Sequence, residues 1–118
     1  MLINHSEMVN ALAKPDLEIY HSLVNGDMHL LHMAIGVSGE AGELIDAIKK
    51  YVIYRKPLDR ENVIEELGDL EFYMEGLRQS LNISREETLE ANIQKLGKRY
   101  QDGYSDKAAQ ERADKQGE

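Results

Sequence analysis

The chain of 118 residues has no cysteine and a formal charge of −8, with 14 Lys and Arg against 22 Asp and Glu. This composition excludes a disulfide scaffold and a thiolate metal site, and it argues against unaided binding to nucleic acid or to an anionic membrane, since both would repel the chain. No apolar run approaches the roughly 20 residues of a membrane helix, and the first residues lack the pattern of a signal peptide, so we expect one soluble, cytoplasmic domain.

Residues 1–26 are the least regular part of the sequence. Ser6 can cap a short helix over residues 6–13, and a second short helix is predicted over residues 16–24. Asn25 and Gly26 then predict a turn, after which Asp27 is a suitable N-cap for the next helix. We therefore treat residues 1–26 as a separate N-terminal helical segment.

Apolar residues at spacings of three and four predict one long helix over residues 28–54. Its inward stripe is Leu30, Ala34, Val37, Ala41, Leu44, Ile48 and Val52. Gly36, Gly39 and Gly42 lie within this helix, where each costs up to about 1 kcal/mol of helix propensity. Three such residues need a reason, and the close approach of another backbone or of a ligand would supply one.

A second core helix follows the loop at residues 55–59, which contains Pro57. Asp59 can cap this helix, which is predicted over residues 60–81 and closed by Asn82. The inward row of this helix is Val63, Leu67, Leu70, Met74, Leu77 and Leu81.

A third core helix is predicted to begin after Ser84 and to end at Tyr100. Ser84 and Glu87 have the spacing of a capping box, and the apolar row of the helix is Leu89, Ile93, Leu96 and Tyr100. The remaining residues, 101–118, are rich in Ala, Gln and charge. They predict a tail with at most a short helix over residues 105–114.

These elements predict an all-α fold, a helical bundle with one long helix, two further core helices and short N-terminal helices. Trp is absent and only 6% of the residues are aromatic, so aliphatic side chains must form the core. A small bundle with few helices leaves apolar faces uncovered, and association covers them. We expect a homo-oligomer.

Two pairs of acidic residues border the apolar stripes of the first two core helices. Glu40 and Glu43 are three residues apart, and Glu66 and Asp69 have the same spacing. The short loop between the helices indicates antiparallel packing, which brings the four carboxylates to the edge of one core. Acidic residues on a helix are usually solvated, but two pairs at one margin favour a bound cation. Mg²⁺ prefers such oxygen ligands together with phosphate oxygens.

Several other polar residues suit a phosphate-bearing ligand. Asn92, Lys95 and Arg99 form one row of the third helix, and Lys50 lies on the same stripe as Glu40 and Glu43. His29 and His32 lie at the start of the long helix, as candidates to line a site or as structural histidines. Carboxylates, a divalent metal and cations together are typical of a phosphoanhydride hydrolase.

Three segments of the sequence resemble the MazG-like all-α nucleoside triphosphate pyrophosphohydrolases, in the form of small single-domain phage and bacterial members. The segments are Gly39–Leu44, Glu65–Leu70 and Asn92–Tyr100. The family signature is Glu-x-x-Glu, a variable gap and then Glu-x-x-Asp, and here Glu43 and Glu66 are 66 − 43 = 23 positions apart. The resemblance covers about residues 27–100, which makes this range the catalytic helical domain and residues 101–118 a C-terminal tail.

The resemblance implies Mg²⁺-dependent hydrolysis of an NTP or dNTP to the monophosphate and pyrophosphate, with water attacking the α-phosphorus and with Mn²⁺ able to replace Mg²⁺. By position, the catalytic metal ligands are Glu40, Glu43, Glu66 and Asp69. The phosphates are bound by Lys95, Arg99 and Asn92, and Tyr100 shapes that end of the site. Family members form dimers or dimers of dimers, and residues 1–26 become a candidate lid over the base pocket.

The substrate base is less well defined by the sequence. The chain has no Trp to stack on a base, and its single Phe72 lies next to the second acidic pair. These features favour a purine nucleotide such as dGTP or dATP, bound near His29, His32 and Met33. The alternative is a non-catalytic nucleotide-binding or regulatory helical oligomer, and a third hypothesis is a structural oligomer whose acids are solvated.

Overall fold

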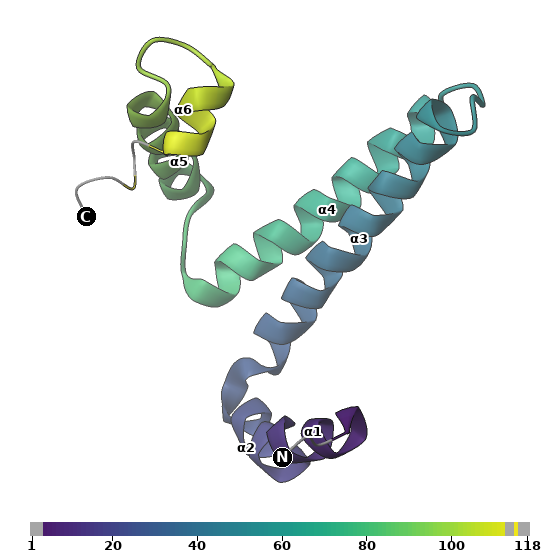
Figure 1. Ribbon diagram of the computed structural model, residues 1–118, viewed down its shortest axis with the longest axis vertical. Coiled ribbons are helices and arrows are strands. Elements are labelled where there is room, and N and C mark those ends of the chain that lie inside the picture. Colours follow the sequence, from purple (N-terminus) through teal and green to yellow (C-terminus); the bar gives the residue numbers. More distant parts are fainter. Residues whose placement is uncertain (1–3, 113–114, 116–118) are drawn as a thin grey trace. The chain divides into compact units, whose positions relative to one another are not determined.

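The computed structural model describes residues 4–112 and residue 115, and within them the chain forms helices and no strand (Figure 1). The predicted all-α fold class is confirmed. The chain divides into two compact units, Met1–Met74 and Glu75–Glu118. Among the described helices, none combines the length and the apolar character needed to cross a bilayer.

The first unit begins with the helices α1 (His5–Leu12) and α2 (Asp16–Ser22) and a π-helical turn η1 (Leu23–Asp27). Asn4 caps α1, so the prediction of Ser6 as the cap was wrong. Asn4 Oδ1 accepts the Glu7 N–H at 2.8 Å, and the Glu7 carboxylate accepts the Asn4 N–H at 3.3 Å. Of Asn4 and Ser6, Asn4 is the residue followed three positions later by an acidic residue, which a reciprocal cap requires. The predicted break at Asn25 and Gly26 is confirmed, because Gly26 has a φ of +103°.

The long helix α3 (Met28–Val52) lies antiparallel to α4 (Arg60–Leu81), as Figure 1 shows. The predicted bounds of both helices are confirmed to within two residues. Asp59 caps α4 as predicted, with its Oδ1 accepting the Asn62 N–H at 3.1 Å. Asp27 stands at the N-cap position of α3 but makes no side-chain hydrogen bond there.

Gly36 lets the aromatic ring of Tyr73 pack directly against the backbone of α3. A Cβ atom at Gly36 would overlap the ring carbons of Tyr73. A Cβ at Gly39 or Gly42 would meet no described atom within 4 Å beyond its chain neighbours and the adjacent backbone of its own helix. A close approach is therefore present at one of the three glycines, but a side chain makes it, rather than the backbone or ligand that the sequence predicted.

Replacing Gly36 with Ala is expected to lower the free energy of unfolding by about 1–3 kcal/mol, because the ring of Tyr73 and the helix must move apart. Urea denaturation measures this change. Gly39→Ala and Gly42→Ala are the matched controls, and each should raise stability by up to about 1 kcal/mol through helix propensity. Equal effects at all three positions would contradict the assigned role of Gly36.

The face of α3 that contacts α4 is rotated from the predicted apolar stripe. Met33 and Ala47 are the buried apolar residues of the described chain, whereas Ile48 and Val52 of the predicted stripe are 40% and 50% exposed. The prediction that the latter two point inward was wrong for the single chain. Because α3 packs here against one helix, it buries a narrow strip that includes small residues, and its larger aliphatic side chains remain outside.

The row predicted for α4 is buried only in part. Val63, Leu70, Met74 and Leu77 are half-buried, but Leu67 and Leu81 are 47% and 50% exposed. The last turns of α4 belong to the second unit, where Asn82 ends the helix as predicted. Its φ is +55°, and the Ile83 N–H donates to the Arg78 carbonyl at 2.9 Å. Asn is one of the few residues that adopt this conformation readily.

The second unit also contains α5 (Arg85–Arg99) and α6 (Asp106–Glu111). Ser84 caps α5 by accepting the Glu87 N–H at 3.0 Å, and Ser105 caps α6 in the same way. The apolar row predicted for the third core helix is not buried within this chain, since Leu89, Ile93 and Leu96 are all exposed. The short helix predicted over residues 105–114 ends at Glu111, and residues 113–114 lie outside the described residues.

Candidate active site

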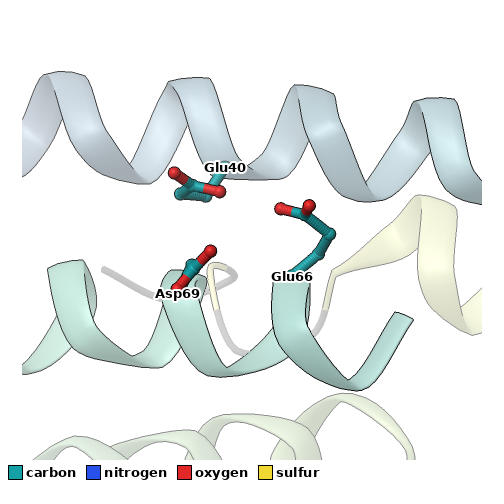
Figure 2. A group of neighbouring side chains, drawn as sticks. All are labelled: Glu40, Glu66 and Asp69. Atoms are coloured by element: carbon teal, nitrogen blue, oxygen red, sulfur yellow. The ribbon is translucent and has the colours of Figure 1, made fainter. Parts of the chain in front are cut away.

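Three carboxylates converge between α3 and α4 (Figure 2). Glu40 projects from α3, and Glu66 and Asp69 project from successive turns of α4 toward it. One oxygen atom of each residue lies within 4.8 Å of those of the other two. The three-residue spacing on α4 places Glu66 and Asp69 on the same side of that helix, and the antiparallel packing brings Glu40 opposite them.

Glu66 has the most perturbed environment of the three. Its Oε2 atom is buried and has no hydrogen-bond partner among the described residues. Its pKa is raised above the ordinary value of 4.5, first by a hydrogen bond that only its protonated form donates to Glu40, and then by desolvation. The negative charges of Glu40, Asp69 and Glu43 raise this pKa further. Without a bound cation, these surroundings therefore disfavour the ionised form of Glu66 compared with a carboxyl group in water.

The raised pKa of Glu66 predicts that the metal-free protein loses stability as the pH rises. The folded state holds the Glu66 proton more tightly than the unfolded state does, so this contribution is fully present below the unfolded value of 4.5. It is lost as the pH rises through the folded pKa. Urea denaturation in EDTA at successive pH values measures the slope, which should be smaller in Glu66→Gln. An unchanged slope would contradict the assignment.

The cluster fits a hard divalent cation. Its metal-binding atoms would be carboxylate oxygens from two helices, and one of these oxygens, Glu66 Oε2, is buried without a partner among the described residues. A bound cation would offset the repulsion among the carboxylates. Glu43, the fourth predicted ligand, is exposed and stands outside the group of three, although its charge contributes to the raised pKa of Glu66. Its role as a ligand remains a prediction.

The other predicted residues of the first unit lie along α3 on both sides of the cluster. His29 and His32 are exposed, and the ring of His32 meets that of Tyr73 edge-on, with 6.1 Å between centroids. Met33 is only 6% exposed, and its place beside a base stays a prediction of the sequence. Lys50 pairs with Asp46 at 3.2 Å, and it lies ten residues beyond Glu40, about 15 Å along the helix.

The predicted phosphate-binding residues lie in the second unit. Asn92 and Lys95 are exposed on α5, while Arg99 and Tyr100 are half-buried at its end. Arg99 and Tyr100 line an open depression of about 480 Å³, which Asn92 and Lys95 do not line. The position of this row relative to the carboxylates stays a prediction of the sequence.

Some residues that the structure places at these sites had no role predicted from the sequence. Tyr73 lies on α4, one turn after Asp69, and contacts both Gly36 and His32 of α3. In the second unit, Lys98 and Lys107 line the same depression as Arg99. The position of Tyr73, four residues after Asp69, was a usable signal, because residues with this spacing share one side of a helix.

The fold and the site define a class of protein: an all-α protein with an acidic cluster suited to a divalent metal. The family profile of the MazG nucleotide pyrophosphohydrolase domain matches residues 29–104, a range that contains Glu40, Glu66 and Asp69. No curated protein and no solved structure gave a significant match. The chain belongs to the MazG nucleotide pyrophosphohydrolase family, and the resemblance is confirmed.

Membership of this family makes the protein a hydrolase that acts on nucleoside triphosphates. MazG proteins generally depend on a divalent metal, and the acidic cluster of this chain is consistent with that requirement. A nucleotide substrate is likewise consistent with the domain.

Proposed function

We propose that this protein hydrolyses an NTP or dNTP to the nucleoside monophosphate and pyrophosphate in the presence of Mg²⁺. The observation that carries the proposal is the convergence of Glu40, Glu66 and Asp69 within the matched domain. In the reaction, water adds to the α-phosphorus, the bond from this phosphorus to the oxygen bridging to the β-phosphorus breaks, and pyrophosphate leaves.

The chain's own carboxylates account for the metal requirement. Glu40, Glu66 and Asp69, with Glu43 as a fourth ligand, would hold Mg²⁺, with Mn²⁺ as a substitute. The bound ion supplies positive charge and Lewis acidity at a phosphoanhydride centre. Glu66 must lose its proton to become a ligand, and a bound cation would favour this loss against the neighbouring charges that raise its pKa.

The phosphates are bound in this proposal by Asn92, Lys95 and Arg99, with Tyr100 beside them. The clustering of cations at the end of α5 supports this assignment. Lys50 is a further candidate, although in this chain it is paired with Asp46.

For the base, we propose a purine, bound at the start of α3 beside His29 and His32. The edge-on contact of His32 with Tyr73 offers an aromatic surface in this region. Residues 1–26 are proposed as a lid over the base pocket, of which residues 1–3 lie outside the described residues.

The active form is proposed to be a homodimer or homotetramer. The support is an apolar face on α3, which we define as Leu44, Ile45, Ile48, Val52 and Ile53. These residues, with Lys49, line an open depression of about 530 Å³, and Ile45 and Ile53 are 67% and 64% exposed. Contiguous exposed apolar surface of this kind marks an interaction site in a stable protein.

A product assay tests the proposed reaction. The purified protein is incubated with each common NTP and dNTP, with Mg²⁺ or with EDTA, and products are separated by anion-exchange chromatography. The expected result is direct formation of monophosphate and pyrophosphate only with the metal, fastest for a purine nucleotide. A diphosphate intermediate would contradict the proposed bond cleavage, and binding without turnover would favour a nucleotide-binding module.

A further inference from the structure

Positive charge is concentrated at the end of α3, in the loop that follows it and at the first residue of α4. Residues 47–60 contain five cations and one acid, although the whole chain has a net charge of −8. The cations are Lys49, Lys50, Arg55, Lys56 and Arg60, and the acid is Asp59. Cations in the last turn of a helix compensate its dipole, which accounts for Lys49 and Lys50. Arg55 and Lys56 follow the end of the helix and need another explanation.

Three of the charged groups near Arg55 and Lys56 already have partners. Lys50 pairs with Asp46 at 3.2 Å, and the Lys49 ammonium lies 5.4 Å from the ring centroid of Tyr54. The Asp59 carboxylate accepts the Asn62 N–H at the start of α4. Among the described residues, no carboxylate forms an ion pair with Arg55 or Lys56. These two cations are available to a ligand.

Arg55 and Lys56 line an open depression of about 420 Å³ together with Tyr51, Val52 and Pro57. This volume falls within the range of about 300–1,000 Å³ that is typical of small-molecule sites. The lining combines two cations with an aromatic ring and two aliphatic side chains. Such a combination suits a ligand with a phosphate group, which carries up to two negative charges, joined to a planar ring that stacks on Tyr51.

The backbone holds the two cations in place at this depression. Arg55 has a φ of +57°, a left-handed conformation that glycine adopts without steric cost and arginine does not. The Lys56 N–H donates to the Lys50 carbonyl at 3.1 Å, which ties the loop to the end of α3. A charged side chain therefore stands at a position where glycine would relieve strain, and strain of this kind is typical of functional positions.

We propose that this depression is a second binding site of the chain, for a phosphate monoester attached to a planar ring, that is, a nucleoside monophosphate. Arg55 and Lys56 bind the phosphate, and the base lies against Tyr51. Tyr51 is 11 residues beyond Glu40 on α3, about 16 Å along the helix. The site is therefore separate from the carboxylate cluster, and its ligand needs no metal.

Isothermal titration of the full chain with AMP in EDTA tests the proposal. AMP is expected to bind. Adenosine, which lacks the phosphate, and ribose 5-phosphate, which lacks the base, should each bind at least about tenfold more weakly. Arg55→Gly and Lys56→Gln should each weaken AMP binding by about tenfold or more through loss of a charge-assisted hydrogen bond. Arg55→Gly also relieves the backbone strain, so thermal melting should show it folded and lost binding cannot be ascribed to unfolding.

Two controls separate this site from general charge and from the carboxylate cluster. Lys49→Gln removes the same charge nearby without altering the lining, and Glu66→Gln alters the cluster. Both variants should bind AMP as the unsubstituted protein does. The proposal is overturned by absence of AMP binding in EDTA, by equal weakening in Lys49→Gln, by loss of binding in Glu66→Gln, or by adenosine binding as tightly as AMP.

Discussion

Replacing Glu66 with Gln is expected to lower the rate of Mg²⁺-dependent nucleotide hydrolysis by more than about 100-fold, because even residues that only support metal ligands are worth about 10–100-fold. The same substitution should raise the melting temperature of the protein in EDTA. It removes a negative charge from a site where Glu40, Asp69 and Glu43 repel it, and the Gln amide can donate to Glu40 as protonated Glu66 does. Product chromatography measures the rate, and thermal unfolding measures the stability.

The matched control for this experiment is Glu71→Gln. Glu71 lies on the same helix, is exposed and stands outside the carboxylate cluster, so its substitution makes the same change in net charge. Activity should stay near that of the unsubstituted protein. Full activity in Glu66→Gln would exclude Glu66 as a metal ligand, and an equal loss in Glu71→Gln would assign the effect to net charge alone.

Replacing Ile45 with Asp is expected to convert the proposed oligomer into monomers. Ile45 is 67% exposed in the single chain and belongs to the apolar face of α3 defined above. A charge at the centre of a buried interface should weaken association by at least about 30-fold, the scale of an interface hot spot. Light scattering after size-exclusion chromatography measures the mass over a range of protein concentrations.

Ile45→Val is the control for this substitution, because it keeps an apolar side chain of similar shape at the same position. It should retain the oligomer. Two results would contradict the proposed interface: a monomeric unsubstituted protein at high concentration, or an unchanged mass for Ile45→Asp. If the monomeric variant also loses hydrolysis while remaining helical by circular dichroism, association is required for activity.

The sequence was sufficient to predict the helices because their limits depend on local interactions. Asp59 and Ser84 cap their helices by hydrogen bonds to residues three positions later, and Asn82 ends α4 in a left-handed conformation. The pairs Glu40 with Glu43, and Glu66 with Asp69, were recognisable from a three-residue spacing. Ser6 and Asp27 show the limit of single-residue signals: Asn4 with Glu7 forms a reciprocal cap in place of Ser6, and Asp27 makes no side-chain hydrogen bond at its position.

The contacts between helices could not be predicted from the spacing of residues along each helix. The rotation of α3 about its axis is set by its neighbour, and the ring of Tyr73 against Gly36 belongs to that packing. The same rotation brings Glu40, rather than Glu43, into the group with Glu66 and Asp69. Because the contact face is rotated from the predicted stripe, Ile48 and Val52 also remain exposed.

The sequence by itself thus determined the all-α class, the helix limits, the family and the acidic residues of the candidate site. Only the tertiary structure decided which carboxylates meet and that the pKa of Glu66 lies above its ordinary value. It also decided that Arg55 and Lys56 share a depression with Tyr51. The physical reason is that a helix forms through contacts within a few residues, whereas charge interaction and burial depend on distances between residues far apart in the chain.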